Sequence, residues 1–445
     1  SRLGMDITSH NIANVNTPGF SRQRVENKAA YPMQLPQGQL GLGVRSEQIV
    51  RVRDGLLDAQ YRQTSFSLGN ATVKENLYTQ LESIMQEPDE TGIGNLMTDF
   101  FSEFSNLAAD PENTAIRSTL RQKAISLVDA FHRKDEQLAS MQESIRNDTL
   151  SAVDQVNQLT GQIADLNRQI TTAEISTGKA NDLRDQRDLL LDKLSEYVKI
   201  TYTEDQRGQL TVNTEGMNLV SGVEAKAISA KTINDGVQIR LQLMDSNGKT
   251  ADVQYGRLGG MLEMYNKTIP GMLDKLDTLS SNLVTEVNRL HSAGQRLPVG
   301  DPPTPSAGID FFTGTDAGTI NISREIMDDV SNIASSVDGT PGNGEVAIAI
   351  SNIRNQKMFN GGSQTLDDFY TGAINSLGIE IQKSQNTRQS QELLQQQISN
   401  QRDAASGVSL DEEMTNLIKY QRSFEAAAKV VGAVDEMMQT IINMV

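Results

Sequence analysis

The sequence predicts a mainly α-helical fold with an inserted β domain, on three observations. Long stretches repeat apolar residues every three or four positions, as helices with one buried face do. Between 198 and 256 apolar residues instead alternate with polar ones, as in strands. Helical patterns also occupy both chain ends. We therefore expect paired terminal helices forming a coiled-coil domain, a long helical inner domain and a small outer β domain.

Composition narrows the class of protein. The 445 residues include no Cys, which excludes disulfides and thiol chemistry. This absence fits either a cytosolic protein or a chain that must travel unfolded. The net charge of −17 disfavours nucleic acid as a partner, and no apolar run is long enough for membrane insertion. Residues 1–62 differ from the rest of the acidic chain in their charge, because they contain eight Lys and Arg against five Asp and Glu. This weakly basic end is expected to meet acidic neighbours.

The N-terminal segment predicts a helix, a turn and an extended region. The chain starts at Ser1 without an initiator Met, which suggests a processed or truncated end. Residues 1–16 should form a short helix that stops before Thr17-Pro18-Gly19-Phe20. Pro18 fixes φ and Gly19 supplies a positive φ, which together favour a type II turn. Residues 21–55 look extended and irregular because Pro and Gly recur there.

Helical patterning dominates the next stretch. Two helices are expected between Phe66 and Leu107. Asp110-Pro111 is predicted to start another, because an acceptor side chain precedes a Pro at the first helical position. That helix should run almost unbroken to about Thr172, and Asn181–Val198 should form one more.

After the strands, helix is expected at 258–293 and again from 345 to 402, separated by a Pro-rich stretch with a short strand at Ile320 and Ile322. Three turn signals, each ending in Gly, divide the strand region at 207–208, 235–236 and 247–248. The expected domains are 1–62 with 403–445 as a terminal coiled coil and extended loop, 63–197 with 257–295 and 345–402 as a helical domain, 198–256 as an outer β domain, and 296–344 as a Pro/Gly-rich linker with a short strand.

The C-terminal helix carries a coiled-coil seam. A capping box at 409–412 should open it, and apolar residues then recur at alternating steps of four and three. A terminal helix cannot bury such a seam alone, so it needs a partner within the chain or in another copy. Gln421 and Asp435 interrupt the seam, either as solvated register markers or as a specific contact. The seam consists of Leu410, Met414, Leu417, Gln421, Phe424, Ala428, Val431, Asp435, Met438, Ile442 and Val445.

Catalytic patterns are missing from the sequence. His10, His132 and His291 are scattered without metal-ligand spacing, and no phosphate loop or nucleophile motif occurs. Most Asp and Glu fall on helix faces expected to be solvated. Asp182, Asp185 and Asp188 share one side of an amphipathic helix, which favours a structural role over acid–base chemistry. We therefore expect no enzyme, no cofactor and no metal.

Four segments carry a resemblance to a known family. SHNIANVNTPGFSRQRV resembles the N-terminal signature shared by flagellar rod, hook and hook-associated proteins, and its TPGF-SRQ form is similar to the hook-associated protein 1 (FlgK) family. The C-terminal LDEEMTNLIKYQRSFEAAAKVVGAVDEMMQTIINMV resembles the same family. NDLRDQRDLLLDKLSEYV and Gly256–Gly294 agree with it as well. The hook-associated proteins form the junction between flagellar hook and filament.

The resemblance implies a structural function. The terminal helices would pair as an inner tube, long helices would form the next layer, and β domains would face outward. Such a chain is exported by the flagellar type III system and lies outside the cell at the hook–filament junction. The implied partners are further copies in a ring or tube, hook protein, the next hook-associated protein, and an export chaperone at the C-terminal helix.

The expected assembly interface combines the turn with the seam. The three Asn residues around the turn would cap the helix and bond the loop, and would also fix a loop that contacts adjacent subunits. The alternatives are a hook or rod axial protein, or a secreted coiled-coil effector or adhesin that acts as a binding module. The interface residues are Asn11, Asn14, Asn16, Thr17, Pro18, Gly19, Phe20, Gln23, Leu410, Met414, Leu417, Ile418, Gln421, Phe424, Ala428, Val431, Met438 and Ile442.

Overall fold

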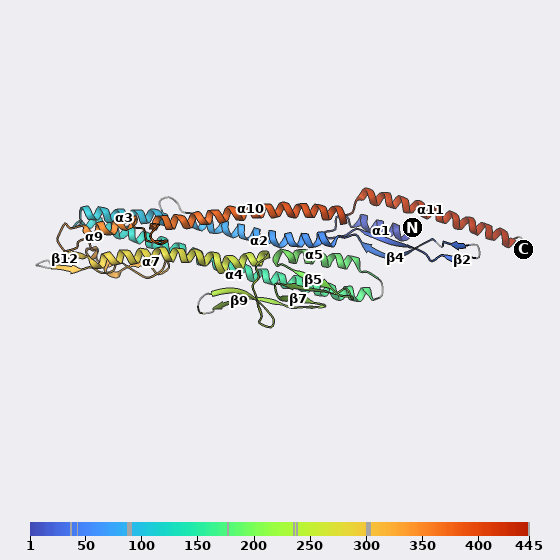
Figure 1. Cartoon of the computed structure of the whole chain (residues 1–445), viewed down its shortest axis with the longest axis horizontal. Helices are drawn as coiled ribbons and strands as arrows, with labels where there is room; N and C mark the ends of the chain where they lie inside the picture. The colour runs from blue at the N-terminus through green and yellow to red at the C-terminus, as the bar shows by residue number, and fades with distance from the viewer. Residues whose placement is uncertain are drawn as a thin grey trace.

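The protein is an elongated helical molecule with both chain ends at the same pole (Figure 1). This computed structural model describes residues 1–35, 38–41, 43–86, 91–175, 178–234, 236, 239–299 and 304–443. Pro36, Asp235, Val237, Pro302, Pro303 and Val445, which the sequence patterns include, lie outside these ranges. The predicted class, mainly α with an inserted β domain, is confirmed.

The N-terminal elements begin with α1 (Arg2–Ala13) and the predicted turn. Gly19 has φ 79°, and the Phe20 N–H donates to the Thr17 carbonyl at 3.2 Å, so the turn prediction is confirmed. Residues 21–55 are more regular than expected, because they form two antiparallel strand pairs, β1 with β4 and β2 with β3. Their bounds are β1 Gln23–Ala29, β2 Met33–Leu35, β3 Gly38–Leu40 and β4 Val44–Arg51.

The first long helices are α2 (Gly55–Met85), α3 (Ile93–Ala109) and α4 (Thr114–Glu174). α2 starts earlier than expected because the Asp54 carboxylate accepts the Leu56 and Leu57 N–H groups. The predicted start at Asp110-Pro111 is wrong. Asp110 ends α3 instead, and the Asn113 side chain caps α4 by accepting two N–H groups of its first turn.

The β domain lies along α4 and consists of two antiparallel sheets (Figure 1). α5 (Asn181–Tyr197) leads into it, as predicted. The Asn167 side chain in α4 anchors the larger sheet, because its amide donates to the Leu210 carbonyl at 2.8 Å and its oxygen accepts the Leu210 N–H at 3.1 Å. One sheet contains β5 Thr201–Glu204, β6 Leu210–Thr214, β7 Met217–Ser221 and β8 Glu224–Ala225; the other contains β9 Ile228–Asn234, β10 Ile239–Asp245 and β11 Thr250–Ala251.

The expected helix at 258–293 contains a change of helix type. α6 (Gly256–Glu263) passes through one π-helical turn, η1 (Met264–Thr268), into α7 (Ile269–Ala293). Pro270 follows this turn and has no N–H to donate, so a widened turn just before it costs no backbone hydrogen bond at that residue.

Residues 296–344 form more than a linker. Phe311 and Phe312 are fully buried against α3: Phe311 meets Phe100 edge-on and Phe104 at a tilt, and Phe312 meets Phe100 at a tilt. The expected linker therefore needs correction: Pro is crowded at its start, but the apolar residues that follow complete the distal core. The elements here are β12 Gln295–Val299, β13 Thr304–Ala307, β14 Phe312–Thr313, β15 Asn321–Ile322, α8 Arg324–Asp328 and η2 Val330–Asn332.

The helical stretch expected at 345–402 is interrupted. α9 (Glu345–Ser351) and η3 (Asn352–Asn355) end before a tight turn in which Asn360 has φ 49°. α10 (Leu366–Ser406) starts at a capping box between Thr365 and Asp368, and it packs along α2. α11 (Leu410–Asn443) starts where predicted and packs against α1.

The distal core holds a buried histidine in one tautomer. His291 of α7 donates from Nδ1 to the Ile309 carbonyl at 2.5 Å, and its Nε2 accepts the Ala334 N–H at 2.8 Å. Burial lowers the pKa of His291 to about 4, against a hydrogen bond to Ile309 that raises it and nearby Arg117 and Arg296 that lower it further. A second ring proton would point at the Ala334 N–H, so only the neutral ring fits.

This histidine predicts a pH dependence of folding. The ring takes up a proton near pH 6.5 in the unfolded chain but only near pH 4 in the folded one. The free energy of unfolding is therefore highest above pH 6.5 and decreases as the pH is lowered from 6.5 to 4. Between pH 6.5 and 5 the loss should be about 2 kcal/mol, measured by urea unfolding. His291→Gln should flatten this slope, and an unchanged slope in the variant would contradict the assignment.

Candidate functional site: the terminal joint

We define the terminal joint as the region where α1, the turn at 17–20, β1, β4, the start of α2, α5, the end of α10 and the start of α11 meet. Figure 1 places these elements together near the N-terminus. Neither chain end could form it alone.

Asn11 connects both ends of the chain. Its amide donates to the Gln23 carbonyl at 2.9 Å and its oxygen accepts the Gln23 N–H at 3.0 Å, so the side chain pairs with β1 as a strand would. The same amide donates to Glu413 Oε2 at 3.1 Å. Glu413 is only 2% exposed and also accepts from Arg22 Nε at 2.7 Å. The Glu413 carboxylate of α11 therefore binds both Asn11 of α1 and Arg22, the residue that precedes β1.

A close contact between helices supports this link. Gly4 of α1 faces Tyr420 of α11, and a Cβ at this position would lie 2.9 Å from the ring. Gly therefore allows the two helices to approach at this point. Leu417, one turn before Tyr420, is half-buried, whereas the described residues after Tyr420 are exposed. The two ends thus pair over a short length.

The turn packs against α5. Gly19 lies over Leu189, with its Cβ position 3.1 Å from the Leu189 Cβ, so both its positive φ and this contact favour Gly. The Phe20 ring packs edge-on against the His10 ring, with 5.4 Å between the ring centres. Asn14 donates to the His10 carbonyl at 3.0 Å and closes the end of α1.

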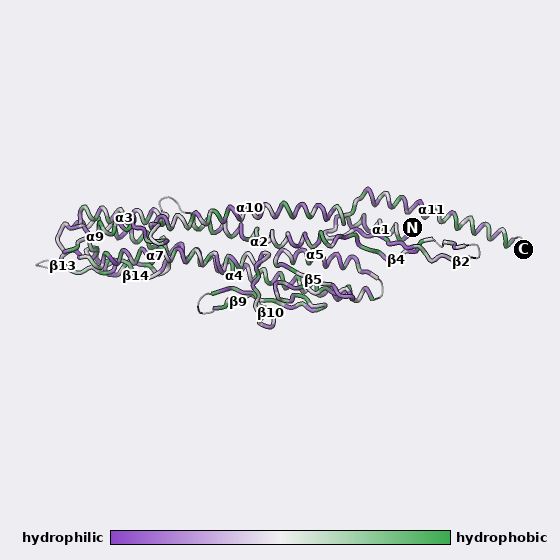
Figure 2. The backbone as a smooth tube through the Cα atoms, in the orientation of Figure 1, coloured by the Kyte–Doolittle hydropathy of each residue, from purple (hydrophilic) through white to green (hydrophobic). Residues whose placement is uncertain are grey.

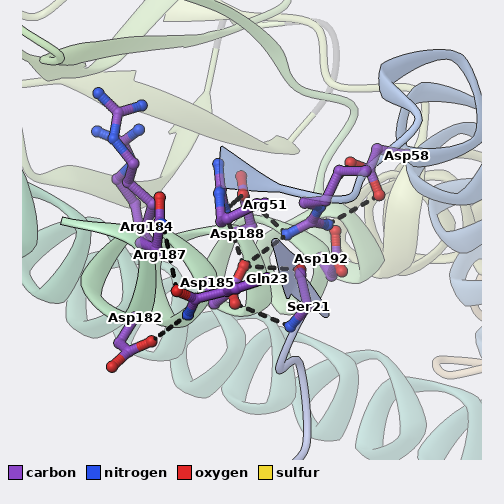
Figure 3. A network of polar contacts seen from close by, with 12 residues as sticks. Ser21, Gln23, Arg51, Asp58, Asp182, Arg184, Asp185, Arg187, Asp188 and Asp192 are labelled. Atoms are coloured by element: carbon purple, nitrogen blue, oxygen red, sulfur yellow. Dashed lines mark hydrogen bonds and ion pairs between the residues drawn. The ribbon is translucent and has the colours of Figure 1, made fainter. Parts of the chain in front are cut away.

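Ser21 and Gln23 bind the start of α5. The Ser21 N–H and hydroxyl donate to the two Asp185 oxygens at 2.8 and 2.7 Å. Gln23 donates to Asp182 at 2.7 Å and accepts from Asn181 at 3.2 Å. The residues that follow the turn are therefore held by side chains of one helix, as Figure 3 shows.

Behind these contacts lies a largely buried network of arginines and aspartates (Figure 3). Arg51 of β4 bridges Asp185 at 2.8 Å and Asp188 at 2.7 Å. Arg402, near the end of α10, joins Asp58 at 2.8 Å to Asp192 at 2.7 Å. Its members come from four parts of the chain: Arg51 and Arg53, Asp58 and Arg62 of α2, Asp185, Asp188 and Asp192 of α5, and Arg402.

The charges in this network stabilise one another in their ionised forms. Burial would raise the pKa of Asp188, but the attraction of Arg53, Arg51 and Arg62 outweighs it and holds the pKa below the ordinary value. Burial likewise opposes the charge of Arg53, yet Asp188 and Asp58 raise its pKa above the usual range. Ionised Asp188 therefore contributes to the stability of the fold at any pH above the ordinary pKa of Asp. That contribution is lost as the pH falls through the lower pKa that Asp188 has in the folded protein.

The structure brings together part of the predicted interface. Asn11, Gly19, Phe20 and Gln23 lie in the terminal joint, and Asn14 closes α1. Asn16, Thr17 and Pro18 are exposed at the turn. Most of the seam is not covered by α1, since the 12 residues of α1 span about 18 Å and the 34 of α11 about 51 Å. The exposed seam and flanking positions are Leu410, Met414, Ile418, Gln421, Phe424, Ala428, Val431, Met438 and Ile442.

Several residues of the joint were missed by the sequence patterns. Asp58, Asp185 and Asp192 are less than a tenth exposed, so the expectation of solvated carboxylates is wrong for them. Ser21, Glu413 and Tyr420 belong to the segments that carry the family resemblance, but they were not among the expected interface residues. A signal existed: the basic excess of residues 1–62 and the acidic spacing of α5 are complementary, and the structure confirms that they meet.

Within the described ranges, no group of three or more His, Cys, Asp or Glu could hold a metal ion. Of the helices in those ranges, none is long and apolar enough to cross a membrane.

Three family models match the chain, one over its middle and one at each end. The flagellar hook-associated protein FlgK helical domain matches residues 78–312. The flagella basal body rod protein model matches 2–20, and the flagellar basal body rod FlgEFG protein C-terminal model matches 399–444. The last two cover the two ends that meet in the terminal joint.

Individual proteins agree with these models. Flagellar hook-associated protein 1 of Bacillus subtilis is 30% identical, covering 99% of this chain and 95% of its own length. The protein of the same name from Escherichia coli is 22% identical over 100% of this chain and 97% of its own. The structure of the flagellar hook junction protein FlgK from Burkholderia pseudomallei matches with a TM-score of 0.66 at 16% identity, covering 80% of this chain and 100% of that one.

A helical molecule whose paired ends match rod-protein models is a structural protein of the flagellar axis. More closely, the chain belongs to the flagellar hook-associated protein 1 family.

The terminal joint predicts unequal effects for two aspartates of one helix face. Asp185→Asn removes a buried charge that three side chains and a backbone N–H approach, so we expect a loss of roughly 3 kcal/mol in the free energy of unfolding. Asp182→Asn is the matched control, since the Asp182 side chain is 56% exposed and should cost less than about 1 kcal/mol. Urea unfolding followed by circular dichroism compares them, and equal losses would contradict a buried role for Asp185.

Proposed function

We propose that this chain is a structural subunit of the junction between flagellar hook and filament, lying outside the cell after type III export. Family membership supports the flagellar part of this proposal, and the similar protein solved from Burkholderia is a flagellar hook junction protein. The family is one of structural proteins, so the proposed role is assembly rather than catalysis.

One observation carries the proposal: beyond the terminal joint, α11 presents an apolar surface that no described part of the chain covers. Figure 2 shows apolar residues recurring along α11 toward the C-terminus. Covering eight such side chains at about 1.5 kcal/mol each would contribute on the order of 10 kcal/mol. We call these residues the α11 stripe: Phe424, Val430, Val431, Val434, Met437, Met438, Ile441 and Ile442.

The proposed partners follow from this surface. In the assembled junction the α11 stripe would pack against further copies in a ring or tube, with hook protein on one side and the next hook-associated protein on the other. Before export, a flagellar chaperone would cover the same stripe. The turn residues Asn16, Thr17 and Pro18, exposed beside the joint, would add contacts to adjacent subunits.

We also propose that the chain divides functionally along the boundaries expected from the sequence. Residues 1–62 with 403–445 would form the inner tube, and 63–197 with 257–295 and 345–402 the helical layer. Residues 198–256 would face outward. The distal core supports one change, because Phe311 and Phe312 join 296–344 to the helical layer.

The alternatives receive less support. A hook or rod protein would share the two terminal matches, but the helical-domain match at 78–312 belongs to the hook-associated family. A secreted effector or adhesin would not be expected to match flagellar models at both ends and in the middle.

A truncation tests the α11 stripe. A chain that ends at Ser423 keeps Glu413 with Asn11 and Arg22, and Tyr420 with Gly4, so the terminal joint should stay folded. It should nevertheless lose binding to isolated hooks and to the export chaperone, because the stripe is removed. Co-sedimentation with hooks and chaperone pull-down measure both.

The control is the full chain with Ile348→Asp on α9, an apolar side chain exposed at the opposite pole (Figure 1). This variant should bind hooks and chaperone normally. If the Ser423 truncation bound both as well as the full chain, the proposed role of the stripe would be wrong.

A further inference from the structure

A second uncovered surface lies at the same pole as the α11 stripe. The strand pairs β1–β4 and β2–β3 form a two-stranded ribbon that extends beyond α1, in the direction in which α11 runs (Figure 1). β1 is exposed from Glu26 to Ala29, and β4 is exposed from Val44 to Gln48. Tyr31 is 79% exposed, Val44 70% and Met33 47%. We call residues 27–35, 38–41 and 43–46 the outer ribbon.

An isolated two-stranded ribbon is only marginally stable in water, since it has no layer against which to bury its apolar side chains. Within one chain, the exposed apolar side chains of the outer ribbon have no such layer. Large apolar side chains that gather without cover mark a contact surface. Tyr31, Met33 and Val44 of the ribbon are therefore available for contact with a partner, as the α11 stripe is.

The two surfaces do not cover each other within one chain. α1 packs against β1 on one side and against α11 on another, so it lies between them at the joint. Beyond α1, the outer ribbon and the α11 stripe both continue in the same direction (Figure 1), and the α11 stripe and the ribbon residues Tyr31, Met33 and Val44 remain exposed. Each surface is thus available to another molecule.

We propose that the outer ribbon of one copy packs on the α11 stripe of the next copy. This inference rests on the proposed function, because it supposes that copies assemble. The two surfaces are different parts of one chain, so their contact is heterologous, and repetition of a heterologous contact generates a ring or a helical tube. A self-complementary contact would instead stop at a dimer.

Charge supports the pairing. Between 27 and 46 the charged residues are Lys28, which forms an ion pair with Glu47 at 3.2 Å, and Arg45. Between 424 and 443 three acidic residues outnumber Lys429. Arg45 lies 5.4 Å from the centre of the Tyr31 ring and is exposed, so it can reach a carboxylate of another molecule. Asp435, which interrupts the apolar seam, is the acidic residue that this docking brings to Arg45.

Cross-linking tests this contact because the chain contains no Cys. Val44→Cys is paired in turn with Val431→Cys, Val434→Cys and Met438→Cys, each as a separate full-length chain. Mixed chains are bound to isolated hooks and oxidised, and disulfide-linked dimers are counted on a non-reducing gel. A disulfide forms only where two Cα atoms come within about 7 Å.

We expect at least one mixture to give a dimer that needs both variants, with a yield at least tenfold above Ile348→Cys mixed with the same α11 variants. A chain carrying both Val44→Cys and Val434→Cys that closes on itself at high dilution would overturn the proposal. So would α11-to-α11 dimers without ribbon-to-α11 dimers, although self-assembly would then still stand. Chains that failed to stay on hooks at all would refute the proposed function itself.

Discussion

The attraction between the carboxylates of α5 and the surrounding arginines holds the two ends of the chain in one arrangement. Asp185, Asp188 and Asp192 lie on one helix face, and arginines from β4, α2 and α10 close over them. A buried ion network is costly to break, because a lone charge would remain without water. It therefore fixes where residues 17–23 run, and through Asn11 and Glu413 it fixes how α1 meets α11.

Polar and apolar contacts have separate tasks at this pole. The terminal joint is held by directional hydrogen bonds and ion pairs, which set one geometry for the two chain ends. The α11 stripe and the apolar residues Tyr31, Met33 and Val44 of the outer ribbon are uncovered, so they gain free energy only when another molecule covers them. In the proposed assembly, the terminal joint is formed within one subunit, and the two uncovered surfaces are covered by other copies.

The sequence predicted the elements better than their connections. Periodicity located α4, α5 and α11, and Pro18-Gly19 predicted the turn, because these depend on local preferences. The buried role of Asp185 depended on Arg51 and Arg53, which are remote in sequence, so spacing alone suggested a solvated face. The capping of α4 by Asn113 rather than Asp110, and the burial of Phe311 after a Pro-rich stretch, were likewise decided by tertiary packing.

Hydrogen exchange of the full chain, free and then bound to isolated hooks, separates what is folded in the free subunit from what is covered on assembly. We predict that amides of 181–197 and of 410–420 exchange slowly in both states, because the terminal joint is already formed. Amides of 424–443 should exchange rapidly in the free chain and become strongly protected on hooks. Equal protection of 424–443 in both states, or a joint that becomes protected only on hooks, would contradict this division of the molecule.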